Sequence, residues 1–513
     1  MTEKKQSIAK SAILVTLMML AFKLVAFVKQ AFIASYFGAT VETDAYFIAW
    51  GFVTGISEAV IKALGISIVA IYTSYRINEG KEKAARLINA LVELTFPCFV
   101  VIAGIIVICA PVIGKLLAPS YEGDALSLVI SFLRILAPIL VFAGIQMIFS
   151  AMMDSYKSFF IPRLESFLYS VLVILSCIFL SKILGVNALV LAQYVSSTVF
   201  LILLIVSISR FHTFFFTKIS EVPELKRIFL TAVPMIVGNS ALQLNQMVDK
   251  AITSGLDDGT TSALYYCHIL YECVVNIMIA NLGNVMFANF AEMVAKGEKE
   301  KVRATLTRAV NTLICFLIGI TIITVVFSKD IVSIVYLRGN FTYEAMILSS
   351  TALVGYAVSF VAVAVRDLSV QSMFAFADTK HPMIANVIAI AINICFSILL
   401  SRYIGILGVA VATSISTVVG MFLDGFFLKK KMPEYRYSVN LLTFAKCIPA
   451  ALLLGGYCFV IYRFVNLSSL LRFIIVSVPG LLMYFGVMCL CGIGEMREIA
   501  GKVFHKVSGK KTE

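Results

Sequence analysis

The sequence predicts an all-α polytopic membrane protein in which about 14 transmembrane helices form two parallel six-helix lobes plus two extra C-terminal helices. Three observations predict this fold. Hydrophobic residues make up 60% of the 513 residues and charged residues only 14%, and the mean hydropathy is +0.97, all outside the range of soluble domains. Long apolar stretches recur along the chain, and the pattern of the first half returns in the second.

The helices follow from the apolar stretches. A helix needs roughly 20 apolar residues to cross the hydrocarbon core of a bilayer, and short polar breaks divide this chain into such stretches. Their continuity argues against a β-barrel, whose strands alternate polar and apolar residues. We predict helices at 8–34, 45–74, 84–110, 125–152, 161–181, 187–208, 225–253, 262–293, 303–327, 346–375, 383–402, 406–427, 441–463 and 470–491.

The repeat has a spacing of about 220 residues. The segment from Phe179 to Gly185 returns as the segment from Leu399 to Gly405 (405 − 185 = 220), and Pro162 returns as Pro382. Two homologous hydrophobic bundles in one chain are typical of secondary transporters. We therefore predict an N-lobe at 1–209, a cytoplasmic connector at 210–227, a C-lobe at 228–430, two further helices at 431–493 and a basic cytoplasmic tail at 494–513.

The net charge of +13 is distributed by loop. Lys and Arg gather in every second loop, whereas the loops at 35–44 and 254–262 contain neither. Because cationic loops resist translocation, both termini are expected in the cytoplasm. We interpret the positive charge as orientation and attraction to anionic lipids, and expect no nucleic acid as partner.

Charged residues within the helices are the candidates for chemistry, because a charge in hydrocarbon normally faces a wet cavity or a partner. Lys23 and Lys29 lie in the first helix without an acidic residue one turn away. Six helical residues rotate by about 240° net, so the two side chains diverge by about 120°. We expect them to line a cavity for an anionic substrate.

The other charges have two interpretations. Glu58 and Lys62, four residues apart, can form an ion pair or contact a ligand, and the adjacent Arg366 and Asp367 can do either as well. Lys250 is expected to extend to the membrane interface. The remaining candidates for substrate binding are Asp44, which opens the second helix, and His268 and Glu272 in the eighth.

Several motifs resemble those of one known family, the MurJ/MviN lipid II flippases of the multidrug/oligosaccharidyl-lipid/polysaccharide exporter superfamily. Phe22 to Gln30 and Ala34 to Phe47 are similar to its S-R-x-x-G-F-x-R, A-x-x-F-G-A and T-D-A-F-F motifs. Arg338 to Phe341 is similar to Y-G-x-F, and Asp378 to Pro382 to D-T-K-x-P. The resemblance covers nearly the whole chain, including the plan of six, six and two helices.

The resemblance implies a flippase that moves an undecaprenyl-pyrophosphate-linked cell-wall precursor, lipid II above all, from the inner to the outer leaflet by alternating access. Lys23 and Lys29 stand where the family has cavity arginines, and Asp44 matches its acidic residue. The implied location is the inner membrane of a bacterial cell, and the implied partners are the lipid-linked glycan, membrane lipids and cell-wall synthesis proteins. No cofactor is implied. Either a coupled ion or the membrane potential is expected to drive the alternating-access cycle in one direction.

The chain also departs from the family pattern. Lysine keeps the charge of the two helix-one arginines but loses their bidentate fork. The family's helix-two arginine falls near Glu58, one turn from Lys62, and its helix-eight Asp-Arg pair falls on His268-Ile269. Lys62, His268 and Arg366 are therefore the candidate substitutes.

Three hypotheses remain open from the sequence. The first is a flippase for lipid II or another lipid-linked oligosaccharide or polysaccharide unit. The second is a cation-coupled exporter of small molecules, and the third is a non-transporting partner of wall-synthesis proteins. We expect no enzyme, because the sequence has no paired carboxylates with a base, no nucleotide-binding loop and no metal-ligand cluster.

Overall fold

A computed structural model describes residues 2–158, 160–209, 215, 217, 222, 224–465, 467–498 and 501. It does not describe the side chains of residues 2–17, 19, 20, 242, 280, 281 and 284. The predicted connector 210–227 and tail 494–513 lie mostly outside the described residues. The chain divides into two compact units, which are Met1–Ser262 with Arg338–Thr342, and Ala263–Leu337 with Tyr343–Glu513.

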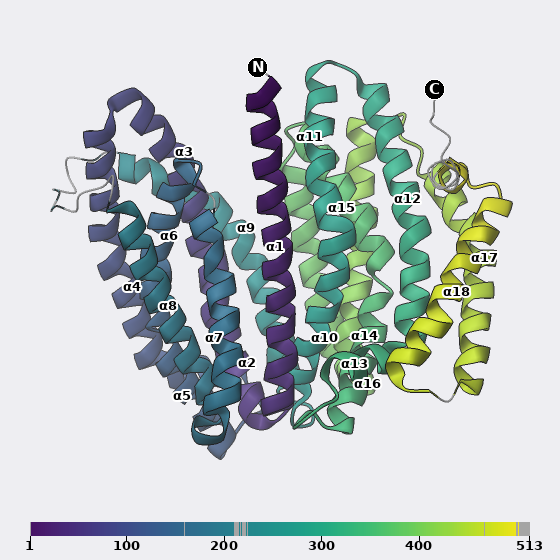
Figure 1. Cartoon of the computed structure of the whole chain (residues 1–513), viewed down its shortest axis with the longest axis horizontal. Helices are drawn as coiled ribbons and strands as arrows, with labels where there is room; N and C mark the ends of the chain where they lie inside the picture. Colours follow the sequence, from purple (N-terminus) through teal and green to yellow (C-terminus); the bar gives the residue numbers. More distant parts are fainter. Residues whose placement is uncertain are drawn as a thin grey trace. The chain divides into compact units, whose positions relative to one another are not determined.

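Every described element is helical, as predicted (Figure 1). Unit 1 holds α1 (Thr2–Phe37), α2 (Val41–Ile56), the π-helix η1 (Ser57–Ile61), α3 (Lys62–Glu79), α4 (Lys81–Leu117), α5 (Gly123–Leu136), α6 (Ile139–Ser155), α7 (Phe160–Leu184), α8 (Asn187–Ile208) and α9 (Glu224–Thr253). Its apolar core joins α3, α4, α6, α8 and α9.

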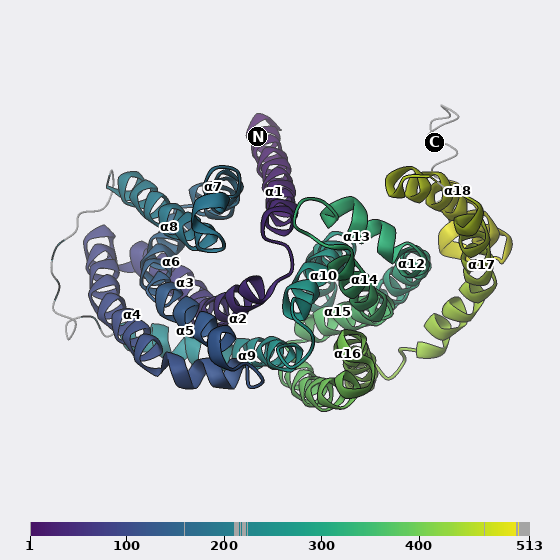
Figure 2. The same cartoon turned by 90° about the horizontal axis from the view of Figure 1, so that it is seen from below.

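Helix α10 (Thr260–Val275) leads from unit 1 into unit 2. Unit 2 continues with the π-helix η3 (Asn276–Ala280), α11 (Asn281–Ala295), α12 (Lys299–Val326), α13 (Ser328–Tyr336), α14 (Tyr343–Ala357), α15 (Phe360–Ala375), α16 (Lys380–Lys431), α17 (Tyr437–Phe464) and α18 (Ser469–Leu490). The last two are the predicted extra helices, and they pack against each other and α12 (Figure 2).

Eleven helices among the described residues are long and apolar enough to span a membrane, or twelve if α14 and α15, bent by 47°, form one span. Helix α16 has 52 residues, about 78 Å at 1.5 Å per residue, which exceeds one bilayer. Its backbone leaves helical geometry at Ile404 and Gly405, between the two helices predicted there. The total of fourteen stays a prediction.

The predicted repeat is confirmed by unusual backbone geometry. Gly185 and Gly405, 220 residues apart, have φ of 54° and 55°. Lys157 and Ala377, also 220 apart, have φ of 61° and 57°, a left-handed conformation that non-glycine residues rarely adopt. The two π-helices begin at Ser57 and Asn276, 219 residues apart. The two halves therefore share local distortions as well as sequence.

Helix α9 packs on α2, α3 and α4 of unit 1. The sequence predicts this helix in a C-lobe that begins at 228. The predicted boundaries of the lobes, connector and tail stay predictions.

Asp378 joins the two ends of α16. Its carboxylate contacts the His381 ring at 2.8 Å and the Lys431 ammonium at 3.3 Å, and it accepts a hydrogen bond from the His381 amide. Burial raises the pKa of Asp378, but the hydrogen bonds from His381 and Lys431 outweigh it and hold the pKa below its usual range. The contact accounts for the aspartate of the D-T-K-x-P-like segment.

The Asp378 contacts are expected to stabilise the start of α16 above the ordinary aspartate pKa of about 3.9 and to be lost as pH falls through the lower folded value. Asp378→Ala should therefore raise amide exchange in residues 379–383 about fivefold at neutral pH, corresponding to about 1 kcal/mol for a lost side-chain acceptor at the helix start. Hydrogen exchange by mass spectrometry, corrected for intrinsic rates, measures this. The start of α7, where Ser158 occupies the equivalent position, is the control; unchanged exchange at 379–383 would refute the assignment.

Candidate functional site

Lys29 is the most deeply buried of the predicted cationic site residues. Its side chain is 9% exposed on α1, and its ammonium lies 4.4 Å from the centre of the Tyr169 ring on α7. No carboxylate among the described residues forms an ion pair with it. A desolvated cation held only by an aromatic face remains electrostatically unsatisfied, which makes Lys29 suited to an anionic ligand.

Three aromatic side chains of unit 1 lie in a row beside Lys29. The Tyr169 ring lies 6.1 Å from Trp50 on α2, and Trp50 stacks on Tyr46 at 6.3 Å. Sequence reasoning missed this series, although Trp50 is the single tryptophan of the chain. Rigid aromatic side chains lose little entropy on contact, so they can both position the ammonium and pack against a ligand.

Lys23 lies on a different side of α1 from Lys29, as the helical spacing predicted. Its side chain is exposed, whereas Lys29 is directed to α7. The structure therefore does not bring the two lysines together on one partner.

Glu58 and Lys62 form the predicted ion pair. The ammonium lies 2.9 Å from the carboxylate, and both side chains are more than half exposed. Glu58 lies within η1 and Lys62 directly follows it, and π-turns within α-helices are frequent at functional sites. An exposed pair is worth little to stability, so Lys62 can exchange Glu58 for another anion at low cost.

The expectation for Lys250 is wrong. Instead of extending to the interface, its ammonium donates a 3.0 Å hydrogen bond to the Phe47 carbonyl of α2. It reaches this carbonyl across Gly51, where a Cβ would lie 1.6 Å from the ammonium. Because Gly51 has no side chain, the Lys250 ammonium can reach the backbone of α2.

Asp44 is buried and occupied by protein donors. Its carboxylate accepts hydrogen bonds from the Gly259 amide at 2.9 Å, the Ser262 amide at 2.6 Å and the Tyr121 hydroxyl at 3.3 Å. Burial and the nearby Asp44 charge raise the pKa of Tyr121, so its hydroxyl stays protonated and donates. Substrate contact by Asp44 is untested, and we leave it out of the proposed cation site.

Asp44→Ala is expected to destabilise the protein by about 2–3 kcal/mol, because it leaves two buried amides at the start of α10 without acceptors. Asp44→Asn keeps one acceptor oxygen, so its stability should lie between those of Asp44→Ala and the parent. Thermal unfolding of the full chain in detergent measures both. The exposed Glu42, two residues away, provides Glu42→Ala as a control; equal melting temperatures for Asp44→Ala and this control would contradict the prediction.

In unit 2, His268 and Glu272 lie one turn apart on α10. The imidazole Nε2 is 3.9 Å from the Glu272 carboxylate, and its ring contacts Tyr271 and Tyr356, each at 5.8 Å between centres. Glu272 also accepts a 2.8 Å hydrogen bond from Asn276 at η3. Both side chains are partly exposed. The structure therefore brings these two predicted residues together.

Arg366 is paired, but not with Asp367 as considered from the sequence. Its guanidinium donates to the Asp424 carboxylate at 2.9 Å and to the Asn386 side chain at 3.0 Å, both on α16. Successive helical residues point about 100° apart, so Asp367 is directed elsewhere, to α11 at Gly283. Asp424 is fully buried, whereas the Arg366 side chain is 21% exposed. Substrate contact by Arg366 stays a prediction.

The candidate residues thus fall into two groups. Unit 1 presents Lys29, Lys62 and Lys23 as cations, and unit 2 presents the His268–Glu272 pair. No three His, Cys, Asp or Glu side chains in the described part of the chain gather closely enough to hold a metal ion. The lysines of unit 1 can bind an anion electrostatically, and Lys29 can do so beside the Tyr169 ring.

Comparison with known proteins identifies the family. Residues 33–478 match the family model described as lipid II flippase MurJ. The chain belongs to the MurJ family. Probable lipid II flippases MurJ of Buchnera aphidicola subsp. Schizaphis graminum and of Thermotoga maritima are 24% and 22% identical over 427 and 433 residues. These matches cover 81% and 84% of this chain, and 82% and 87% of the relatives.

Solved structures show the same fold. A lipid II flippase MurJ in an inward closed conformation matches with a TM-score of 0.79 at 20% identity, covering 95% of this chain and 100% of that one. An inward-facing MATE multidrug resistance transporter of the MOP superfamily matches with a TM-score of 0.65 at 13% identity, covering 81% and 95%. The predicted resemblance is confirmed, and the MurJ-family chain is a multi-spanning membrane protein.

Proposed function

We propose that this chain moves an undecaprenyl-pyrophosphate-linked cell-wall precursor, lipid II in the first place, from the inner to the outer leaflet by alternating access. Family membership supports the cargo class. The observation that carries the chemistry is the Lys29 ammonium, desolvated within α1 and held on Tyr169 without a carboxylate partner in the described part of the chain. A pyrophosphate supplies the missing counter-charge.

In this proposal Lys29 is the principal diphosphate contact, and the exposed Lys23 and Lys62 add charge. None of the three lysines can make the bidentate contact of an arginine. Binding of the diphosphate therefore depends on charge more than on geometry. His268 and Glu272 contribute contacts in unit 2. No bond of the substrate is made or broken, so the proposal contains no enzymatic step, and the membrane potential or a coupled ion biases the cycle.

The lysine-rich loops support cytoplasmic termini in the bacterial inner membrane, because positive loops resist translocation. The start of the chain can be tested separately from transport. An N-terminal tag accessible to protease only after the cells are opened would support this orientation, and a tag cleaved on intact cells would contradict it.

The function is tested by rescue. Bacteria depleted of their own lipid II flippase should resume peptidoglycan synthesis when this chain is produced in their membrane. Failure to rescue despite normal membrane levels would reject lipid II as cargo in that host.

A flippase for another lipid-linked glycan is the second candidate. The lysines in place of the helix-one arginines favour it, because they relax the geometric demands on the phosphate group. Binding of a polyprenyl diphosphate carrying a different sugar, with no binding of lipid II, would support this alternative. Cation-coupled small-molecule export is less well supported, because the predicted acidic cavity residue Asp44 is occupied by protein donors.

A further inference from the structure

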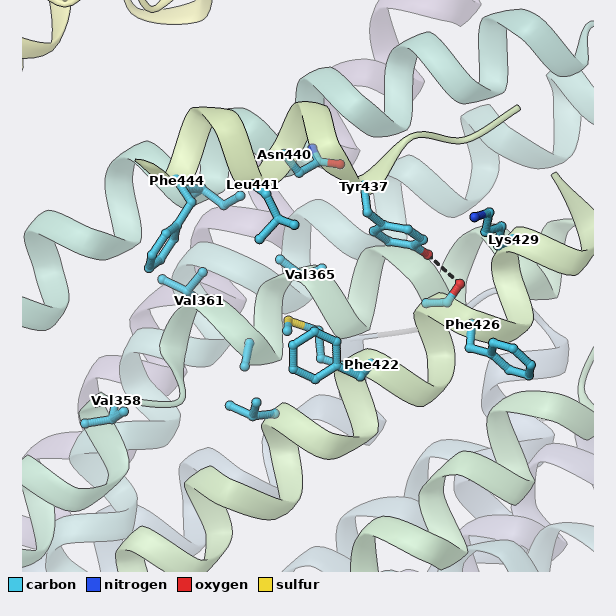
Figure 3. A pocket seen from close by; sticks show the side chains of 15 residues that line it. Val358, Val361, Val365, Phe422, Phe426, Lys429, Tyr437, Asn440, Leu441 and Phe444 are labelled. Carbon is cyan, nitrogen blue, oxygen red and sulfur yellow. Dashed lines mark hydrogen bonds between the residues drawn. The ribbon is translucent and has the colours of Figure 1, made fainter. Parts of the chain in front are cut away.

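An apolar groove runs along unit 2 between α12, α15, α16 and α17 (Figure 3). It has a volume of about 480 Å³, and its walls include Val361 and Val365 of α15, Phe422 of α16, and Leu441 and Phe444 of α17. Phe422 and Leu441 are 64% and 63% exposed. In a membrane-spanning chain, such an open apolar groove accommodates hydrocarbon.

One end of the groove is cationic. Lys429 lines it, and the neighbouring Lys430 holds its ammonium 4.6 Å from the Phe426 ring. Neither lysine forms an ion pair with a carboxylate in the described part of the chain, whereas the next residue, Lys431, contacts Asp378. Lys429 at the groove, and the adjacent Lys430 beside the groove-lining Phe426, are therefore available to an anion.

The Tyr437 hydroxyl lies at the same end and donates a 2.7 Å hydrogen bond to the Gly425 carbonyl (Figure 3). This bond fixes the start of α17 against α16 beside Lys429. The hydrogen bond thus joins α16 and α17 at the cationic end of the groove and fixes the backbone from which the lysines extend.

The length of the groove fits one leaflet. Val418 and Lys429 both line it and are 11 residues apart on α16 (429 − 418 = 11), which corresponds to about 16 Å. Half of a hydrocarbon core of about 30 Å is about 15 Å. An occupant with a charged head at Lys429 would thus reach the bilayer centre near Val418.

We infer that this groove binds an anionic phospholipid, with its headgroup phosphate at Lys429 and Lys430 and an acyl chain along Val365, Phe422 and Leu441. Basic sites between transmembrane helices attract anionic headgroups, whereas a zwitterionic lipid gains less from the lysines. The groove lies wholly in unit 2, whereas Lys29 belongs to unit 1, so the inference does not rest on the proposed cargo. By the distribution of lysines, the lipid belongs to the cytoplasmic leaflet.

The test uses the single tryptophan of the chain. In the full-length double variant Trp50→Phe/Leu441→Trp, the only tryptophan lies at the groove. The protein is reconstituted in phosphatidylcholine vesicles with increasing brominated phosphatidylglycerol, which quenches tryptophan on contact. Half-maximal quenching by brominated phosphatidylglycerol is expected at a mole fraction about fivefold lower than that needed with brominated phosphatidylcholine. One lysine contact with an anionic lipid is worth about 1 kcal/mol, which corresponds to about fivefold in affinity.

Three controls distinguish a site from ordinary lipid contact. Leu452→Trp, on a 71% exposed position of α17 outside the groove, should show no preference between the two lipids. Adding Lys429→Gln/Lys430→Gln to the groove variant should remove its preference, whereas adding Lys299→Gln/Lys301→Gln should retain it. Phe444→Trp replaces Leu441→Trp if the latter does not elute as a folded species.

Equal quenching by both lipids in the Leu441→Trp and Phe444→Trp variants would overturn the inference. So would an unchanged preference after loss of Lys429 and Lys430. Displacement of the brominated lipid by an equimolar polyprenyl diphosphate, while excess unlabelled phosphatidylglycerol fails to displace it, would assign the groove to the cargo tail instead.

Discussion

Lys29→Gln is expected to abolish rescue of flippase-depleted bacteria, whereas Lys29→Arg should retain it. Glutamine keeps most of the side-chain length but removes the charge that pairs with pyrophosphate, a charge-assisted contact worth about 1.5–3 kcal/mol, or about 10- to 100-fold in affinity. Arginine keeps the charge and can also stack on Tyr169. Growth after depletion, together with binding of a polyprenyl diphosphate to purified protein, measures the effect.

Lys182→Gln is the matched control, because Lys182 is an exposed lysine near the end of α7, the helix that also carries Tyr169. It should rescue like the parent at equal membrane levels. Full rescue by Lys29→Gln would remove Lys29 from the substrate path while leaving the proposed function intact. Failure of the parent chain itself would instead count against the cargo.

Arg366→Leu is expected to cost about 3–5 kcal/mol of folding free energy, because it leaves the fully buried Asp424 charge without its partner. Thermal unfolding of the full chain in detergent should show a melting temperature lower by several degrees. The cost arises from the unpaired carboxylate, so removing that carboxylate as well should recover most of it.

The double variant Arg366→Leu/Asp424→Leu provides this comparison. Replacing a whole buried pair by apolar side chains is often close to neutral, so the double variant should melt near the parent. Arg402→Leu, an exposed arginine on the same helix as Asp424, should change little. A double variant no more stable than Arg366→Leu would show that packing of the arginine, not its charge, holds α15 to α16.

The sequence allowed much of the fold to be predicted, because both apolar length and the repeat are local signals. The helices at 441–463 and 470–491 are found at Tyr437–Phe464 and Ser469–Leu490. The divergence of Lys23 and Lys29 also followed from helical rotation alone. The two spans predicted at 383–402 and 406–427 lie within α16, on either side of the non-helical Ile404 and Gly405.

Contacts between distant segments could not be predicted. Lys250 has a partner 203 residues away in sequence, and its path depends on the missing side chain at Gly51. Arg366 binds Asp424 in preference to its immediate neighbour, because side-chain direction on a helix outweighs closeness in sequence. For the same reason Asp44, which looked like a cavity carboxylate, proved to accept hydrogen bonds from the amides at the start of α10.

The paired π-turns carry a consequence for the history of this chain. A π-turn accommodates one extra residue in a helix, and η1 and η3 occupy matching places in the two halves. Two independent insertions at the same place are less parsimonious than one, so the extra residue belonged to a half-length ancestor before its gene duplicated. The distortion has since outlasted most of the amino acids around it, with Ser-Glu-Ala-Val-Ile in one copy and Asn-Ile-Met-Ile-Ala in the other. What descended from that ancestor in both copies is the shape of the bend.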